Sequence, residues 1–211
     1  FPKADDDTVI PMDLINSAID RDVTLAASEP ILWGLDVARF GGDNSALCVR
    51  QGNTVLEITT FNSMDLMQLC GAIKNRYDDS TVMERPQEIL VDVIGLGSGV
   101  VDRLAEQNLP VRGVNVAEAP STKKNYLNLR AELWFAIKDW LAQRDCRLPN
   151  NDELASELAA PQYKYTSSGK IKIESKDEMR KRGIKSPDKA DALALTMASS
   201  AASFGGSQAF M

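Results

Sequence analysis

Short apolar runs alternate with amphipathic stretches along this chain, which is the pattern of a sheet covered by helices. Only turn signals separate the first three runs, Gly-Gly-Asp-Asn at 41–44 and Gln-Gly-Asn at 51–53, which predicts hairpin-joined antiparallel strands. Helix-length segments separate the later runs, which predicts parallel strands joined by crossovers. The expected strands are residues 31–37, 45–50, 54–61, 88–93 and 111–116.

Helical periodicity fills most of the remaining chain. Ser63 is expected to cap a helix over residues 64–77. Ser186 and Pro187 predict the start of the last helix, with serine as the N-cap and proline at the first helical position. Tyrosine and isoleucine alternating around a Ser-Gly turn predict a β-hairpin within residues 162–174. The expected helices are residues 12–21, 64–77, 100–107, 125–143, 152–158, 178–182 and 187–198.

This order of elements predicts an α/β domain with a mixed sheet flanked by helices and an added β-hairpin near the C-terminus. We assign residues 30–200 to the domain. Residues 1–29 are polar and are expected to form a linker or packed extension, and residues 201–211 are expected to form a flexible tail. Because the chain opens on Phe1 rather than methionine, we interpret it as a fragment of a longer protein.

Composition narrows the possible chemistry. The 211 residues include no histidine, which excludes His-dependent nucleophilic triads and His-ligated zinc. Three widely spaced cysteines provide neither a zinc knuckle nor a disulfide framework. Any metal would therefore be bound mostly by oxygen, which favours Mg²⁺ or Mn²⁺. No apolar run reaches the ~18 residues of a membrane span, and the N-terminus does not resemble a signal peptide.

Acidic residues stand at the ends of two predicted strands. Asp36 and Asp92 would meet if those strands are parallel neighbours, and Asp191 lies in the first turns of the last helix, three residues after Asp188. Converging carboxylates repel one another, and divalent cations relieve that repulsion. Alternatively, Asp36 ends a strand, Asp92 starts a turn, and Asp188 and Asp191 stabilise the helix N-terminus. The residues alone leave both interpretations open.

The net charge of −6 argues against nucleic acid, but its distribution weakens that argument. Residues 162–189 hold nine basic and four acidic residues, so a basic face lies on an acidic body. Such a face is compatible with binding the DNA backbone, and equally with a solvated helix and hairpin. The candidate DNA contacts are Lys170, Lys172, Lys176, Arg180, Lys185 and Lys189.

Three segments together carry a family resemblance: GLDVARFGGDNSA at 34–46, VDVIGLGSGVVDRL at 91–104, and ESKDEMRKRG followed by SPDKADALALTMA within 174–198. They resemble the nuclease domain of the large subunit of tailed-phage terminases, which also occurs in prophages. The resemblance covers residues 1–198. It implies an RNase H/integrase-like fold with a five-stranded mixed sheet.

The resemblance further implies an endonuclease that uses Mg²⁺ or Mn²⁺, with two ions, to cut double-stranded DNA concatemers during genome packaging. The acidic triad of the family falls on Asp36, Asp92 and Asp191, with Asp43 and Asp188 as secondary candidates. Implied partners are an upstream ATPase domain, the small terminase subunit and the portal, in the host bacterial cytoplasm and without a membrane. No G-x-x-x-x-G-K-[ST] loop is present, so no ATPase activity is expected from this chain.

Two other functions remain open from the sequence. One is another RNase H-like polynucleotidyl transferase, such as a resolvase or transposase. The other is a non-catalytic module that docks on a portal or capsid, with purely structural acids.

Overall fold

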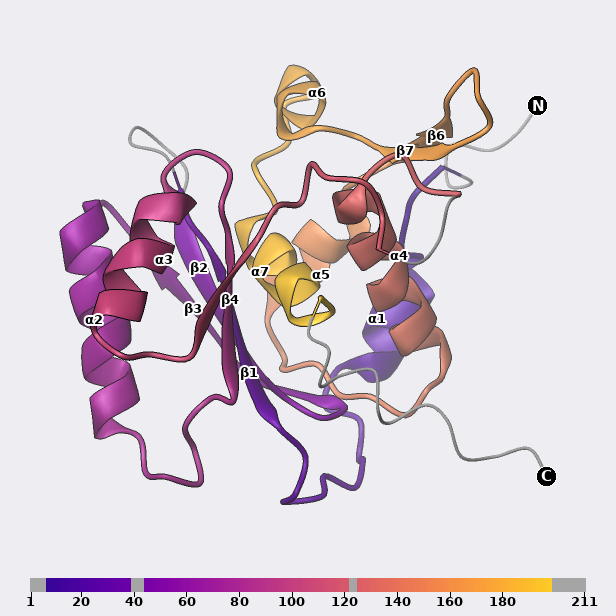
Figure 1. The fold of residues 1–211 in the computed structure, drawn as a ribbon. Coiled ribbons are helices and arrows are strands. Elements are labelled where there is room, and N and C mark those ends of the chain that lie inside the picture. Colours follow the sequence, from indigo (N-terminus) through magenta and orange to yellow (C-terminus); the bar gives the residue numbers. More distant parts are fainter. Residues whose placement is uncertain (1–6, 39–43, 122–124, 199–211) are drawn as a thin grey trace.

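A computed structural model describes residues 7–38, 44–121 and 125–198. A five-stranded sheet with the order β3-β2-β1-β4-β5 forms its centre (Figure 1). β1 (Ile31–Asp36), β2 (Ser45–Gln51) and β3 (Thr54–Phe61) form an antiparallel meander. β4 (Glu88–Asp92) pairs parallel with β1 on the other side, and β5 (Val111–Val114) pairs parallel with β4. The structure therefore confirms the predicted mixed sheet, including the switch from hairpins to crossovers.

The central strand β1 is buried along its whole length because helices cover both faces of the sheet. α2 (Leu66–Asp79) and α3 (Gly97–Glu106) lie on one face, where they pack on Trp33 and Leu35. α7 (Asp188–Thr196) lies on the other face. Behind α7, a further layer consists of α1 (Met12–Ala18), α4 (Leu129–Ala142) and α5 (Asp152–Ala159) (Figure 1).

α7 approaches the sheet unusually closely at Gly34. A β-carbon at this position would lie 2.0 Å from the carbonyl oxygen of Ala192, so only glycine admits the helix there. At the C-terminal end of α7, the buried Arg50 donates hydrogen bonds to the Thr196 side chain (2.8 Å) and carbonyl (2.9 Å). A cation at this end also complements the helix dipole. β1 and β2 thus fix the position of α7.

A small unit separate from the main sheet projects beside α4. It consists of a hairpin, β6 (Tyr163–Tyr165) and β7 (Ile171–Ile173), followed by α6 (Lys176–Lys181) (Figure 1). Tyr163 stacks edge-on against Phe135 of α4, with ring centroids 5.4 Å apart. The added hairpin expected near the C-terminus is therefore present, and aromatic packing attaches it to the helical layer.

Several helices begin at other residues than the sequence predicted. Ser63 does not cap α2: it has a φ of 55°, and Asp65 forms a capping box with Gln68 instead. Ser186 does not cap α7, since its buried hydroxyl has no hydrogen-bond partner among the described residues and Pro187 occupies the N-cap position. α3 begins at Gly97 rather than at residue 100, and α4 begins at Leu129 rather than at residue 125.

The N-terminal segment expected to be a linker or packed extension packs on the domain up to Ala18, whereas residues 20–29 include no buried residue. Val9, Ile10 and Ile15 are fully buried in the core that α4, α5 and α7 share. The predicted tail at 201–211 lies outside the described residues. None of the helices in the described part of the chain is both long and apolar enough to cross a membrane.

Candidate active site

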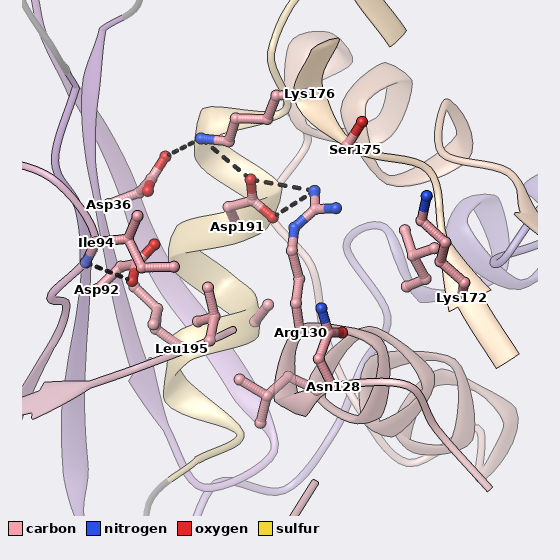
Figure 2. A pocket seen from close by; sticks show the side chains of 14 residues that line it. Asp36, Asp92, Ile94, Asn128, Arg130, Lys172, Ser175, Lys176, Asp191 and Leu195 are labelled. Atoms are coloured by element: carbon pink, nitrogen blue, oxygen red, sulfur yellow. Dashed lines mark hydrogen bonds and ion pairs between the residues drawn. The ribbon is translucent and has the colours of Figure 1, made fainter. Parts of the chain in front are cut away.

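Two acids meet at the carboxyl edge of the parallel strands β1 and β4. Leu35 pairs with Val91, so Asp36 and Asp92 are the next residues of neighbouring strands. The third acid, Asp191, projects from α7 toward the same cavity (Figure 2). The convergence predicted from strand order is therefore observed.

A lysine lies among these acids. Lys176, the first residue of α6, places its ammonium nitrogen 2.9 Å from an Asp36 oxygen and 3.3 Å from an Asp191 oxygen (Figure 2). The same nitrogen lies 3.4 Å from an Asp188 oxygen. Its surroundings raise the pKa of Lys176 above its usual range: burial opposes the charge, but the three aspartates outweigh burial. Lys176 was expected to contact DNA, whereas here it neutralises the acidic cluster.

The lysine affects how a metal could bind. Within the described ranges, no three acidic or cysteine side chains are arranged to hold one metal ion. The donors nevertheless have the chemistry that Mg²⁺ and Mn²⁺ require, since Asp36, Asp92 and Asp191 offer carboxylate oxygens at one edge of the sheet. The ammonium group of Lys176 already lies between Asp36 and Asp191.

Two residues of α4 hold Asp191 from behind. Arg130 donates to both carboxylate oxygens, at 3.1 and 3.4 Å, and the indole nitrogen of Trp134 donates at 2.9 Å. Burial would raise the pKa of Asp191, but Arg130 and then Lys176 outweigh it and lower that pKa overall. Neither Arg130 nor Trp134 is among the site residues predicted from the sequence. Their i, i+4 spacing, which places both on one helix face, was the available signal.

The two strand-end acids favour their neutral forms more strongly. Burial raises the pKa of Asp36 to about 7, although Lys176 opposes this. Burial also raises the pKa of Asp92, while the backbone N–H of Ile94, 3.1 Å from Asp92 Oδ1, partly offsets it. Both carboxyl groups are therefore charged most readily when a cation accompanies them.

Asp188 and Asp43 were the secondary candidates for the acidic site. Asp188 accepts a hydrogen bond from the backbone of Asn44 at 3.2 Å and contacts Lys176, so it links α7 to the start of β2 and to α6. It is within reach of the acidic cluster but also has a structural role. Asp43 lies outside the described residues.

The residues predicted to contact DNA differ in their exposure. Lys170, Arg180 and Lys185 are exposed, as a backbone-binding surface requires. Lys172 lines the cavity and lies 3.4 Å from Glu178, which Lys164 also contacts. Lys189 is buried and pairs with Glu153, so it is not placed to reach DNA.

The cavity extends well beyond the acids, with a volume of about 360 Å³. Asp36 and Asp92 line one side, Asn128 and Lys172 line the other, and Asp191, Lys176 and Arg130 lie between them (Figure 2). Its floor is aliphatic, formed by Val116, Leu133, Ile173, Ala194 and Leu195.

Comparison with known proteins bears on this arrangement. No protein-family model matches the chain, and no curated protein sequence matches it. Among solved structures, it is similar to the nuclease domain of the large terminase subunit gp2 of bacterial virus Sf6, with 21% identity and a TM-score of 0.75 over 90% of this chain and 97% of that chain. A variant of that domain solved with manganese has 20% identity and a TM-score of 0.76, covering 90% of this chain and 98% of that chain.

A second solved relative is the large terminase nuclease from thermophilic phage G20c, determined with bound magnesium. It has 15% identity and a TM-score of 0.67, covering 93% of this chain and 98% of that chain. These likenesses confirm the predicted RNase H-like fold. The chain described here has the fold of the nuclease domains of phage large terminase subunits.

Proposed function

We propose that this chain is the nuclease domain of a terminase large subunit, a metal-dependent endonuclease that cuts double-stranded viral DNA during genome packaging. The observation that carries the proposal is the convergence of Asp36, Asp92 and Asp191 in one cavity, where Lys176 contacts Asp36 and Asp191. The shared fold supports it, as do the manganese and magnesium bound in the similar structures.

Each acid has a distinct support for its part in the reaction. Asp36 and Asp92 are held by the strand ends, and Arg130 and Trp134 orient Asp191. Two Mg²⁺ or Mn²⁺ ions, when bound by these three carboxylates, would activate water and stabilise the leaving oxygen of the phosphodiester. Binding of these ions would require the ammonium group of Lys176 to leave the cluster, which would free it to contact a phosphate.

The exposed side of the hairpin and α6 would hold the DNA backbone. Lys170, Arg180 and Lys185 are exposed there, and Lys172 faces the cavity. Contacts of lysine and arginine with phosphate position the duplex without reading its sequence and weaken with salt. Cleavage with little sequence preference follows.

The full packaging machine would supply the remaining parts. An ATPase domain of the same protein, the small terminase subunit and the portal are the proposed partners, in the cytoplasm of the host bacterium. Their contribution would include avidity, because a single nuclease domain presents few phosphate contacts.

Cleavage of supercoiled plasmid tests the proposal. The protein is incubated at low salt with EDTA, Mg²⁺ or Mn²⁺, beside Asp191→Asn and the matched control Asp102→Asn, which changes an exposed aspartate of α3. We expect metal-dependent nicking and linearisation by the wild type and the control, and none by Asp191→Asn. Equal cleavage by all three proteins would contradict the site assignment.

Two outcomes would favour the other functions. Folded but inactive protein in Mn²⁺ would favour a non-catalytic module that docks on a portal or capsid. Strong preference for branched over linear duplex would favour a resolvase-like or transposase-like enzyme.

A further inference from the structure

The acids line only part of the cavity. A metal centre and a phosphate need polar surroundings, whereas Val116, Leu133 and Leu195 present an aliphatic floor beside Asp191. Leu133 and Leu195 are buried and Val116 is half-buried, and a mainly apolar lining with a few polar groups is typical of sites for small organic ligands. The volume of about 360 Å³ also lies within the range of small-molecule sites, about 300–1,000 Å³.

The polar groups opposite the acids are hydrogen-bond donors. Asn128 caps α4 by accepting a hydrogen bond from the Ala131 N–H at 3.1 Å through its carbonyl oxygen. Its amide nitrogen makes no hydrogen bond to any described residue, so two N–H donors remain available. Arg130 and Lys172 add positive charge to the lining, although Arg130 already donates to Asp191 and to the Glu174 carbonyl and Lys172 lies 3.4 Å from Glu178. A ligand that suits this lining is rich in acceptors and carries negative charge.

We propose that the cavity is a binding site for one deoxynucleotide, the one adjoining the scissile phosphodiester. Its sugar and base would cover the aliphatic floor, and its phosphate and base carbonyl oxygens would meet Asn128, Arg130 and Lys172. This inference rests on the proposed nuclease function, because it places the nucleotide beside Asp36, Asp92 and Asp191.

The proposal has a consequence for the duplex. The floor is recessed between α4, α7 and β7, because Leu133, Leu195 and Ile173 are at most 5% exposed. A base stacked inside a double helix does not reach such a floor, so the nucleotide leaves the stack before cleavage. Mispaired or unpaired positions, which unstack at lower cost, would be preferred sites.

Titration with free ligands tests the site without cleavage. Thymidine 5′-monophosphate and inorganic phosphate are titrated separately into the protein in Mg²⁺ by calorimetry. We expect the nucleotide to bind at least ten-fold more tightly than phosphate. Equal affinities, or no nucleotide binding at millimolar concentration, would overturn the proposal.

Two variants locate the binding. Val116→Phe fills the cavity and should remove the advantage of the nucleotide over phosphate, whereas Val82→Phe, at an exposed loop position outside the cavity, should retain it. Asn128→Asp preserves a good helix cap but replaces the amide donors with a carboxylate, so nucleotide affinity should fall at least ten-fold. Unchanged affinity in both cavity variants would overturn the proposal.

The outcomes separate this site from the nuclease itself. Loss of plasmid cleavage in Asp191→Asn decides whether the chain is a nuclease. The difference in affinity between nucleotide and phosphate decides whether the cavity holds a nucleotide. If the wild type cleaves plasmid but binds both ligands equally, the nuclease stands and the nucleotide site fails.

Discussion

Lys176 shows how a single side chain resolves the electrostatic conflict of the site. Buried carboxylates that face one another are unfavourable without a compensating charge. The ammonium group of Lys176 supplies that charge to Asp36, Asp188 and Asp191 together, and a divalent ion would have to compete with it. The lysine therefore compensates the acids when no metal is bound, and the same contacts lower the affinity of the site for a metal ion.

Removing this ammonium group should strengthen metal binding. Lys176→Met keeps most of the side-chain volume and removes the charge, so we expect Mn²⁺ affinity, measured by calorimetry or electron paramagnetic resonance, to rise at least ten-fold. Lys181→Met, an exposed position on the same helix, is the control. Equal Mn²⁺ affinity in both variants would show that Lys176 does not compete with the ion.

The raised pKa of Asp36 predicts a pH dependence of stability. Because this pKa rises from 3.8 to about 7 in the folded protein, the folded state binds more protons than the unfolded state between those values. Raising the pH through this window therefore lowers the free energy of unfolding. In EDTA, wild type should lose more stability from pH 5 to pH 8 than Asp36→Asn does, by denaturant unfolding. An equal loss of stability in the wild type and in Asp36→Asn would contradict the raised pKa of Asp36.

At the scale of elements, the placement of α7 decides whether the site forms. β1 accepts the helix at Gly34, and Arg50 binds its C-terminal end. At the N-terminal end of α7, the backbone N–H groups of Lys189 and Ala190 donate hydrogen bonds to Glu157 of α5, at 2.7 and 3.0 Å. Charges of the appropriate sign thus hold both ends of the helix that carries Asp191.

A matched pair of glycine substitutions tests this placement. Gly34→Ala forces α7 away from β1, which we expect to destabilise the protein by about 1–3 kcal/mol and to abolish plasmid cleavage. Gly71→Ala lies in the interior of α2, where an added β-carbon meets no atom within 4 Å, so we expect about 0.5–1 kcal/mol of stabilisation. Denaturant unfolding measures both. Similar effects of the two substitutions would mean that α7 tolerates displacement.

The elements also show what the sequence could and could not predict. The five strands and the meeting of Asp36 with Asp92 follow from local patterns, because strand direction and alternation are encoded within short segments. The cap of α7 was mispredicted because Glu157, distant in sequence, takes the role expected of Ser186. The position of Lys176 likewise depends on how the hairpin packs on α4, which no local pattern records.

At the scale of the whole molecule, one side of the sheet carries a local basic surface. The exposed lysines and arginines of the hairpin and α6 lie on the side of α7, away from α2 and α3 (Figure 1). A duplex bound at Asp191 would contact this side. Because the net charge is −6, attraction depends on this local basic surface.

Salt dependence of DNA binding tests which side is used. Replacing both Lys170 and Lys185 by glutamine should lower the slope of log affinity against log salt by about two, one for each lost phosphate contact. Replacing Lys74 of α2 and Arg103 of α3 by glutamine is the control, and it should leave the slope unchanged. Fluorescence anisotropy with a duplex oligonucleotide provides the measurement. An altered slope in the control alone would place the duplex on the opposite side.

The order of the elements along the chain has a consequence for the synthesis of this protein. Asp36 lies in the first strand and Asp191 in the last helix, and α7 packs directly on β1. During synthesis on the ribosome, the first acid emerges long before the helix that completes the set. A nascent chain therefore lacks the third carboxylate until α7 has been made.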